Sequence, residues 1–199
     1  MQVVLVDSGG ANIGSVRYAL ERLGVVAELS GDADTIARAE RVILPGVGAA
    51  PTAMARLREL DLVEVLRGLR QPLLGVCLGM QLLFESSEEG GVDCLGLIPG
   101  RIRKMHGGDG VRIPHMGWNG LQMRRDDALL HDIEEGAQAY FVHSYAAPVT
   151  AATLASCTHG DEFAAVVRHA NCYGAQFHPE RSAAVGARLL ENFLQGEPT

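Results

Sequence analysis

One stretch constrains the fold more than any other: residues 72–85, which read PLLGVCLGMQLLFE. It begins as an apolar strand, turns abruptly at Cys77 and continues as the start of a helix. Gly75 and Gly79 stand two residues before and two residues after the cysteine. Glycines suit such a bend, because larger side chains would collide there. The stretch predicts a nucleophile elbow, although a buried free cysteine in a core strand fits the same residues.

A cysteine at the start of a helix has chemical consequences. The unpaired N–H groups and the dipole at that end of the helix stabilise a thiolate, which is the reactive form of the side chain. The N–H of the next residue can donate to a developing oxyanion. Cys77 is therefore a candidate nucleophile, and Leu78 is a candidate oxyanion donor.

Upstream of the cysteine, apolar strand patterns alternate with apolar residues at helical spacing. Strands are expected at residues 2–6, 25–29, 41–48 (which ends in a loop) and 72–77. Helices are marked by Ile13, Val16, Leu20 and Leu23, by Met54, Leu57 and Leu60, and by Leu62, Val65, Leu66 and Leu69, with a short helix near Asp32 or Asp34. This alternation predicts an α/β fold with a mostly parallel central sheet and helices on both faces.

The pattern changes from residue 91 onward, where glycines recur and helical periodicity fades. Short strands follow, and several are expected to pair antiparallel as an extension of the main sheet. Residues 182–195 predict a closing helix packed on the sheet. The PGVG loop at 45–48, Cys77, His143 and His178 all follow predicted strands, so we expect them at one edge of the sheet.

Composition excludes several classes of protein. The 199 residues predict a single domain, 1–199. The net charge of −7, with no basic cluster larger than RIRK at 101–104, argues against nucleic-acid binding. No apolar run reaches membrane-spanning length, and the N-terminus does not resemble a signal peptide. The four cysteines form no CxxC pair, so a reducing cytoplasm is expected. No His/Cys cluster has zinc spacing, and neither GxGxxG nor a Walker pattern is present, so no metal or phosphate-loop site is indicated.

A cysteine nucleophile needs a base, and His178 in QFHPE is the best placed of the seven histidines. On an extended strand, His178 and Glu180 would project to the same side, and Pro179 would keep His178 extended. Glu180 could then accept from one imidazole nitrogen and leave the other facing Cys77. An exposed turn before the last helix is the alternative, but the elbow makes a triad the better interpretation.

Three further segments carry candidate residues. The glycines of LPGVG (44–48) could let the N–H of Val47 act as a second oxyanion donor, although an ordinary glycine-rich turn explains them equally well. RIPHMGWN (112–119) and YFVHSY (140–145) place aromatic residues and histidines near strand ends. Those aromatics could cap the core or, if exposed, form a partner surface.

Together, GVCLGMQLLFE, QFHPE and the preceding PGVG resemble the class I (triad) glutamine amidotransferases. With PHMGWN, YFVHSY and FHPERS, almost the whole chain is similar to the family of glutaminase subunits of imidazole glycerol phosphate synthase, from histidine biosynthesis. The resemblance implies a flavodoxin-like fold formed by one glutamine amidotransferase type 1 domain. It implies no cofactor.

The resemblance also implies roles for residues. Glutamine would be hydrolysed to glutamate and ammonia through a thioester on Cys77, with His178 as base and then acid and Glu180 orienting it. Val47 and Leu78 resemble the oxyanion donors of the family. The positions that match its glutamine-binding residues are Gly48, Gln81, Glu89, Ser144 and Tyr145.

In this family, ammonia passes into a (β/α)8-barrel cyclase subunit, with which the glutaminase forms a heterodimer. A movable PGVG loop would suit a switch that responds to that partner. Candidate interface residues are Asn12, Trp118, Asn119, Tyr140 and Arg181. Ser8, Ala49 and Ala50 depart from the usual pattern, as does Arg181, which stands where lysine is frequent. A stand-alone Cys-His-Glu hydrolase, an amidotransferase subunit of another pathway and a non-enzymatic scaffold are the alternatives.

Overall fold

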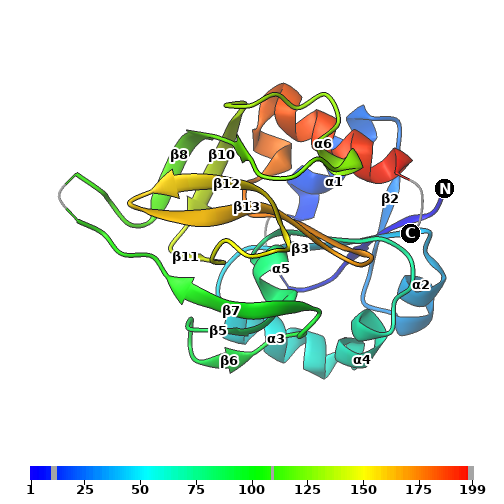
Figure 1. The fold of residues 1–199 in the computed structure, drawn as a ribbon. Helices are drawn as coiled ribbons and strands as arrows, with labels where there is room; N and C mark the ends of the chain where they lie inside the picture. Colours follow the sequence, from blue (N-terminus) through cyan, green and yellow to red (C-terminus); the bar gives the residue numbers. More distant parts are fainter. Residues whose placement is uncertain (10–12, 109, 197–199) are drawn as a thin grey trace.

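The computed structural model describes residues 1–9, 13–108 and 110–196. Its centre is an eight-stranded sheet in the order β2-β1-β3-β4-β14-β13-β12-β9 (Figure 1). Strands β2, β1, β3, β4 and β14 run parallel, and β13, β12 and β9 continue the sheet antiparallel. The strands are β1 (Val3–Val6), β2 (Ala27–Ser30), β3 (Arg41–Gly46), β4 (Leu73–Cys77), β9 (Gln122–Met123), β12 (Thr153–His159), β13 (Asp161–His169) and β14 (Cys172–Ala175).

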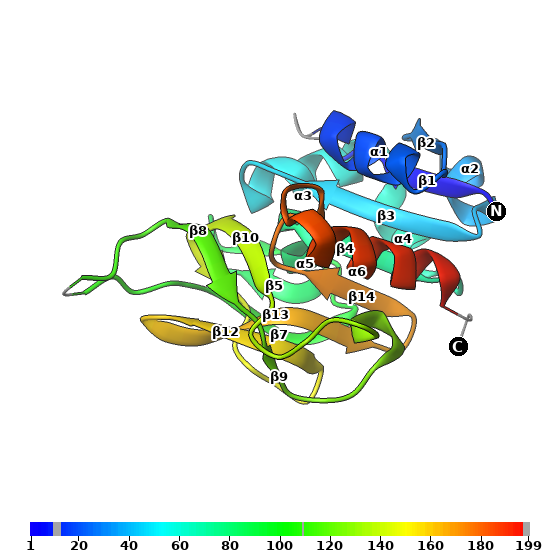
Figure 2. The same ribbon diagram turned by 90° about the horizontal axis from the view of Figure 1, so that it is seen from above.

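Helices cover both faces of this sheet (Figure 2). Side chains of β1 alternate between two cores, as the pleat of a strand requires: Val3 and Leu5 join one, Val4 and Val6 the other. Helices α1 and α6 pack into the first core, and α2, α3 and α4 into the second. The helices are α1 (Ile13–Arg22), α2 (Ala33–Arg38), α3 (Ala50–Glu59), α4 (Leu62–Arg67), α5 (Leu78–Leu82) and α6 (Ala183–Gln195), with 3₁₀ turns η1 (Ala128–Leu130) and η2 (Pro179–Arg181).

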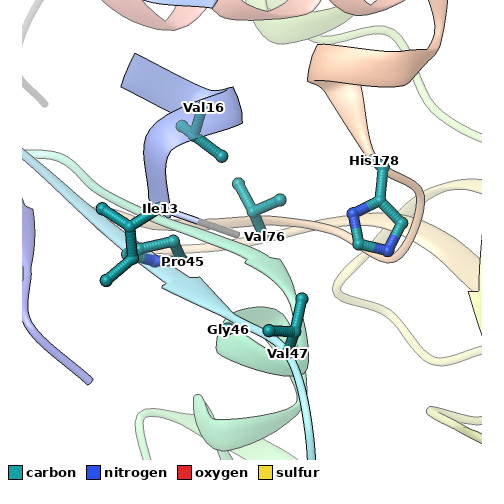
Figure 3. A pocket seen from close by; sticks show the side chains of 7 residues that line it. All are labelled: Ile13, Val16, Pro45, Gly46, Val47, Val76 and His178. Carbon is teal, nitrogen blue, oxygen red and sulfur yellow. The ribbon is translucent and has the colours of Figure 1, made fainter. Parts of the chain in front are cut away.

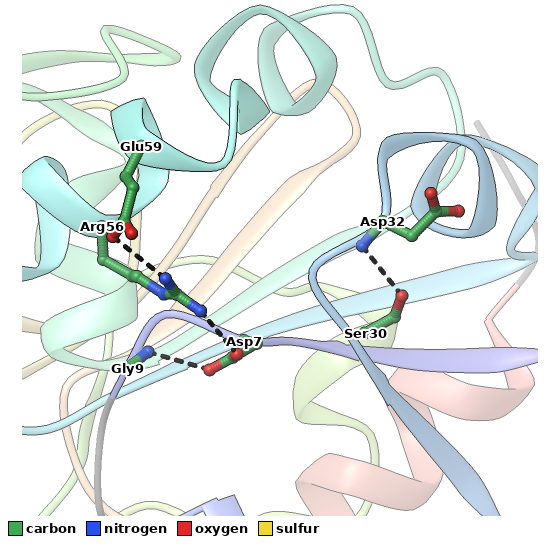
Figure 4. Close-up of polar contacts among 6 residues, drawn as sticks. All are labelled: Asp7, Gly9, Ser30, Asp32, Arg56 and Glu59. Carbon is green, nitrogen blue, oxygen red and sulfur yellow. Dashed lines mark hydrogen bonds and ion pairs between the residues drawn. The ribbon is translucent and has the colours of Figure 1, made fainter.

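Polar contacts fasten the strand ends to the helices of the second face (Figure 4). Arg56 of α3 forms an ion pair with Asp7, which follows β1, at 3.2 Å between Nη2 and Oδ2. Asp32 caps α2 by accepting a hydrogen bond from the N–H of Thr35, and its own N–H donates to Ser30 Oγ at 3.0 Å. An aspartate in this position satisfies the free N–H groups at the start of a helix.

The expected strands and helices up to residue 77 are confirmed, as is the closing helix. The helix after Cys77 is shorter than expected: α5 ends at Leu82, and β5 begins at Phe84. All five residues of α5 are buried, so this short helix belongs to the core and not to the surface.

The antiparallel extension is confirmed only in part. Strands β13, β12 and β9 extend the main sheet, but the other short strands form two separate sheets, β10-β8 and β11-β7-β5-β6. The chain passes from the first of these to the second at Ser144, between β10 and β11. Their bounds are β5 (Phe84–Ser87), β6 (Val92–Asp93), β7 (Ile98–Lys104), β8 (His115–Gly120), β10 (Gln138–His143) and β11 (Tyr145–Ala146).

Across the described part of the chain, every helix is too short or too polar to cross a membrane.

Candidate active site

Cys77 is the last residue of β4, between β3 and β14 in the sheet. Its backbone has φ 54° and ψ −111°, a conformation that non-glycine residues rarely adopt and that marks a strained turn. A Cβ on Gly79 would collide with the carbonyl oxygen of Leu44 in β3, so a glycine lets α5 pass directly against that strand. The bend therefore holds a buried cysteine at the start of a helix, as the sequence predicts.

His178 approaches the cysteine from the segment that follows β14. Its Nδ1 lies 2.9 Å from Oε1 of Glu180, and His178 and Cys77 line the same cavity. Because Nδ1 faces the carboxylate, Nε2 is the nitrogen available to the sulfur. The expected Cys77, His178 and Glu180 are thus brought together.

The backbone that brings them together is not the expected strand. Strand β14 ends at Ala175, and Pro179–Arg181 form the 3₁₀ turn η2. His178 itself is extended, with φ −95° and ψ 101°, and the turn after it folds the Glu180 carboxylate back onto the imidazole. The prediction of the contact was right, and the prediction of its backbone conformation was wrong, because Pro179 starts a 3₁₀ turn instead of prolonging the strand.

Ser182 is a supporting residue that sequence reasoning missed. It is fully buried, and its hydroxyl donates to the His178 carbonyl at 2.7 Å while accepting from the N–H of Tyr140 at 2.9 Å. The N–H of His178 donates in turn to the Tyr140 carbonyl at 2.9 Å. His178 is thereby connected to β10 by hydrogen bonds. The only signal in the sequence was the position of Ser182 directly after HPER.

The environment of His178 favours its charged form. Burial lowers the pKa of His178, but its hydrogen bonds with Cys77 and Glu180 and the negative charges of both outweigh burial and raise the pKa to about 10. An imidazolium beside the sulfur is the partner that a thiolate needs.

A cavity of about 280 Å³ opens beside Cys77. All five positions expected to bind glutamine line it, together with the expected triad residues Cys77 and His178 and the two expected oxyanion donors. Pro114, Val142 and His143 also line it and were not predicted as site residues. The lining residues are Val47, Gly48, Cys77, Leu78, Gln81, Glu89, Pro114, Val142, His143, Ser144, Tyr145 and His178.

The loop after β3 forms one wall of this cavity. Gly48 has φ +98°, which other residues adopt only with strain. The N–H of Ala50, at the start of α3, donates to Oε2 of Glu89 at 2.8 Å. Glu89 thus holds the far end of the loop that carries Val47.

A second hollow, of about 10 Å³, lies on the other side of this loop. Figure 3 shows the imidazole of His178 at its edge, opposite Ile13 and Val16 of α1. Apart from His178 its lining side chains are apolar, so one side of the imidazole faces an apolar surface while Nδ1 faces Glu180.

His143, which lines the cavity, forms a neutral pair with His115. Nδ1 of His143 is 2.9 Å from the Tyr145 carbonyl, and its Nε2 is 3.0 Å from Nδ1 of His115. The carbonyl can only accept, so His143 donates through Nδ1 and accepts through Nε2 from His115. Burial lowers the pKa of His143 to about 3, and burial with the charge of His159 lowers that of His115 to about 4.

Two of the candidate interface residues, Trp118 and Tyr140, lie on the same two strands as this pair, β8 and β10, and face each other across them. Trp118 of β8 is 54% exposed and lies edge-on to Tyr140 of β10, and Arg181 lies 4.6 Å above the Tyr140 ring. The Asn119 amide instead donates inward, to the Thr158 carbonyl at 2.9 Å and towards Nε2 of His115 at 3.4 Å. Asn12 lies outside the described residues.

Comparison with known proteins identifies the family. A family model described as glutamine amidotransferase class-I matches residues 4–196. The imidazole glycerol phosphate synthase subunit HisH of Xanthomonas axonopodis pv. citri (strain 306) is 65% identical over 193 residues, covering 97% of this chain and 96% of that protein. The subunit HisH of Xylella fastidiosa (strain Temecula1 / ATCC 700964) is 59% identical over 194 residues, covering 98% and 97%.

Solved structures share the fold at lower identity. A crystal structure of a glutamine amidotransferase has a TM-score of 0.74 with 21% identity and covers 96% of each chain. The structure of PurLQS from Thermotoga maritima has a TM-score of 0.71 with 20% identity and covers 97% of each chain. The chain belongs to the class I glutamine amidotransferase family and, within it, to the HisH subunits of imidazole glycerol phosphate synthase.

Proposed function

We propose that this chain, as a single domain, hydrolyses L-glutamine to glutamate and ammonia with Cys77 as nucleophile. The observation that supports this most is the arrangement of Cys77, His178 and Glu180 beside a cavity of about 280 Å³. A nucleophile, a base and a group that orients the base are what acyl transfer through a covalent intermediate needs.

The reaction then follows in two halves. The Cys77 thiolate attacks the side-chain amide carbon, and the negative oxygen that forms accepts from the N–H groups of Val47 and Leu78. When this intermediate collapses, the C–N bond breaks and the leaving nitrogen takes the proton of His178, which gives ammonia and a glutamyl thioester. His178 next removes a proton from water, the hydroxide attacks the thioester, and the C–S bond breaks to release glutamate.

We propose that Gly48, Gln81, Glu89, Ser144 and Tyr145 bind the main-chain end of glutamine, since they line the cavity. Gln81 donates through Nε2 to the Tyr145 carbonyl at 2.8 Å and to Oε1 of Gln176 at 3.0 Å. Its own Oε1 therefore remains as an acceptor for the substrate ammonium. Glu89, which accepts from the N–H of Ala50, supplies a negative charge to the same cavity.

The ammonia would pass to a (β/α)8-barrel cyclase subunit in a heterodimer, for imidazole glycerol phosphate synthesis. The relatives are named as subunits of that synthase. We assign the partner face to Trp118, Tyr140 and Arg181, together with Met116, which is 63% exposed on β8. Exposed aromatic, methionine and arginine side chains are typical of interface centres. The four cysteines are all free and buried, which suits the cytoplasm.

The nucleophile can be tested in the complex. Cys77→Ala should abolish turnover with glutamine and leave turnover with added ammonia. Cys94→Ala is the matched control, because Cys94 is buried away from the cavity, and it should retain both activities. Glutamine-dependent turnover by Cys77→Ala would disprove the role of Cys77.

The partner can be tested by the rate of glutamine hydrolysis of the chain alone, with the cyclase, and with the cyclase and its nucleotide ligand. We expect the rate to rise at each step. A high rate for the isolated chain that the cyclase leaves unchanged would instead indicate a stand-alone hydrolase.

A further inference from the structure

A second buried amide reaches the reactive sulfur. Gln176, which follows β14, is fully buried, and its Nε2 lies 3.8 Å from Sγ of Cys77. The residue is absent from the cavity lining, so it approaches the sulfur from the buried side, where water does not compete. The catalytic steps described above do not use it.

The orientation of this amide is determined by a backbone carbonyl. The carbonyl of Tyr145 can only accept, so Gln81 must present its nitrogen to it at 2.8 Å. The same nitrogen of Gln81 lies 3.0 Å from the Gln176 side chain, so that atom of Gln176 must be its oxygen. Gln176 therefore presents its nitrogen, a donor, to the sulfur of Cys77.

A second contact of the sulfur favours the protonated thiol instead of the thiolate. The Val142 carbonyl lies 3.8 Å from Sγ and can accept only from the protonated thiol. A hydrogen bond to the charged form of a group favours that form, and a bond to its neutral form disfavours ionisation. The Gln176 contact is the one that persists, and strengthens, when the thiol proton moves to His178.

We propose that Gln176 is a further catalytic residue, an N–H donor that stabilises the Cys77 thiolate, and that Gln81 and the Tyr145 carbonyl position it. This inference rests on the proposed role of Cys77 as nucleophile. Gln81 also lines the cavity, so the residue that orients the donor is one that glutamine would contact.

The test is the pH dependence of Cys77 alkylation by iodoacetamide in the isolated chain, followed by mass spectrometry. Only the thiolate reacts at an appreciable rate. Gln176→Leu keeps the side-chain volume and removes the donor, so alkylation at neutral pH should slow by about tenfold, and the profile should move to higher pH. A superimposable profile would overturn the proposal.

The three other cysteines serve as a control for loss of native structure in the variant. Cys94, Cys157 and Cys172 are buried and should stay unreactive if Gln176→Leu folds normally. If they react in that variant, Gln81→Met decides the matter, because it leaves Gln176 in place and removes only the group that orients it. A smaller shift in the same direction supports the proposal, and an unchanged profile in Gln81→Met overturns it.

The assay uses neither glutamine nor the cyclase, so its outcome is separable from that of the proposed function. A shifted alkylation profile in a chain that fails to hydrolyse glutamine even with the cyclase and its nucleotide ligand would contradict the proposed function alone. Normal glutamine hydrolysis with an unshifted profile in Gln176→Leu would contradict this inference alone.

Discussion

Two buried histidines line the same cavity and behave in opposite ways. His178 and His143 are each 6% exposed. The pKa of His178 is raised to about 10, whereas that of His143 is lowered to about 3. Burial lowers both values, so burial cannot explain the difference.

The difference comes from the atoms that each ring faces. His178 lies between a carboxylate and a sulfur, both of which gain from a positive charge. His143 lies between the Tyr145 carbonyl and the neutral ring of His115, and the charges of nearby histidines oppose its protonation. The cavity thus has one imidazole suited to moving protons and a neutral pair suited to holding the segment that carries Ser144 and Tyr145.

The largest effect should follow from making His178 resemble His143. Glu180→Gln removes the negative charge and keeps the side-chain shape, so His178 loses its oriented, charged state. We expect the kcat for glutamine hydrolysis to fall by about 10²–10⁴-fold, as for other orienting carboxylates, and the pKa of His178 to drop in an NMR titration. Glu59→Gln, an exposed glutamate on α3, is the control. Near-normal turnover by Glu180→Gln would show that the carboxylate does not determine the state of the ring.

The contact of His178 with Glu180 and its position beside Cys77 could be predicted from the sequence because their signals are local. The strand, turn and helix around Cys77 and the two-residue spacing to Glu180 can be read within a few positions. The pairing of His115 with His143 and the contact of Gln176 with Cys77 join residues that are 28 and 99 positions apart. Nothing in the local pattern specifies such contacts, so neither pairing could be predicted from the sequence.

The same limit applies to the fold. The parallel half of the sheet follows from alternating strands and helices, because each crossover helix constrains where the next strand lies. The sequences of short strands such as β7 and β10 predict that they are strands but not which strands they pair with. The alternation of side chains every two residues is the same in every sheet. That is why several short strands were expected to extend the main sheet, although some of them form the two small sheets.

The second prediction concerns acid stability. The pKa values of His115 and His143 in the folded chain, about 4 and about 3, lie below the ordinary value of 6.5. The unfolded chain therefore binds more protons between these values, so the contribution of the pair is fully present above pH 6.5 and is lost as the pH falls towards 4. We expect the free energy of unfolding to decrease by about 2–4 kcal/mol over that range.

Denaturant unfolding of the isolated chain at several pH values measures this loss. His131→Gln is the control variant, because the side chain of His131 is 74% exposed, and it should show the same acid dependence as the unchanged chain. His178 contributes in the opposite sense: with its raised pKa, its stabilisation is present at low pH and is lost as the pH rises through about 10. Equal stability at pH 7 and pH 4.5 would mean that the pair is not held neutral.

A smaller effect should follow from breaking the neutral pair. His115 is stacked between the rings of Phe141 and His159, so His115→Phe keeps the stacking and leaves Nε2 of His143 without its donor. We expect a loss of about 1–2 kcal/mol in the free energy of unfolding at neutral pH. Because one titrating ring is gone, the further loss between pH 7 and pH 4.5 should be smaller than in the unchanged chain. An unaltered acid dependence in this variant would assign that dependence to other groups.

The smallest effect should come from an exposed charge next to the catalytic turn. Arg181 follows Glu180 directly, but its guanidinium lies 4.6 Å over the Tyr140 ring at the surface. An exposed cation–π contact contributes about 0.5–1 kcal/mol, and solvent screens its charge. Arg181→Gln should therefore lower the free energy of unfolding by no more than about 1 kcal/mol and leave the NMR titration of His178 in place. A large shift of that titration would mean that surface charge, and not the atoms in contact with the ring, makes His178 differ from His143.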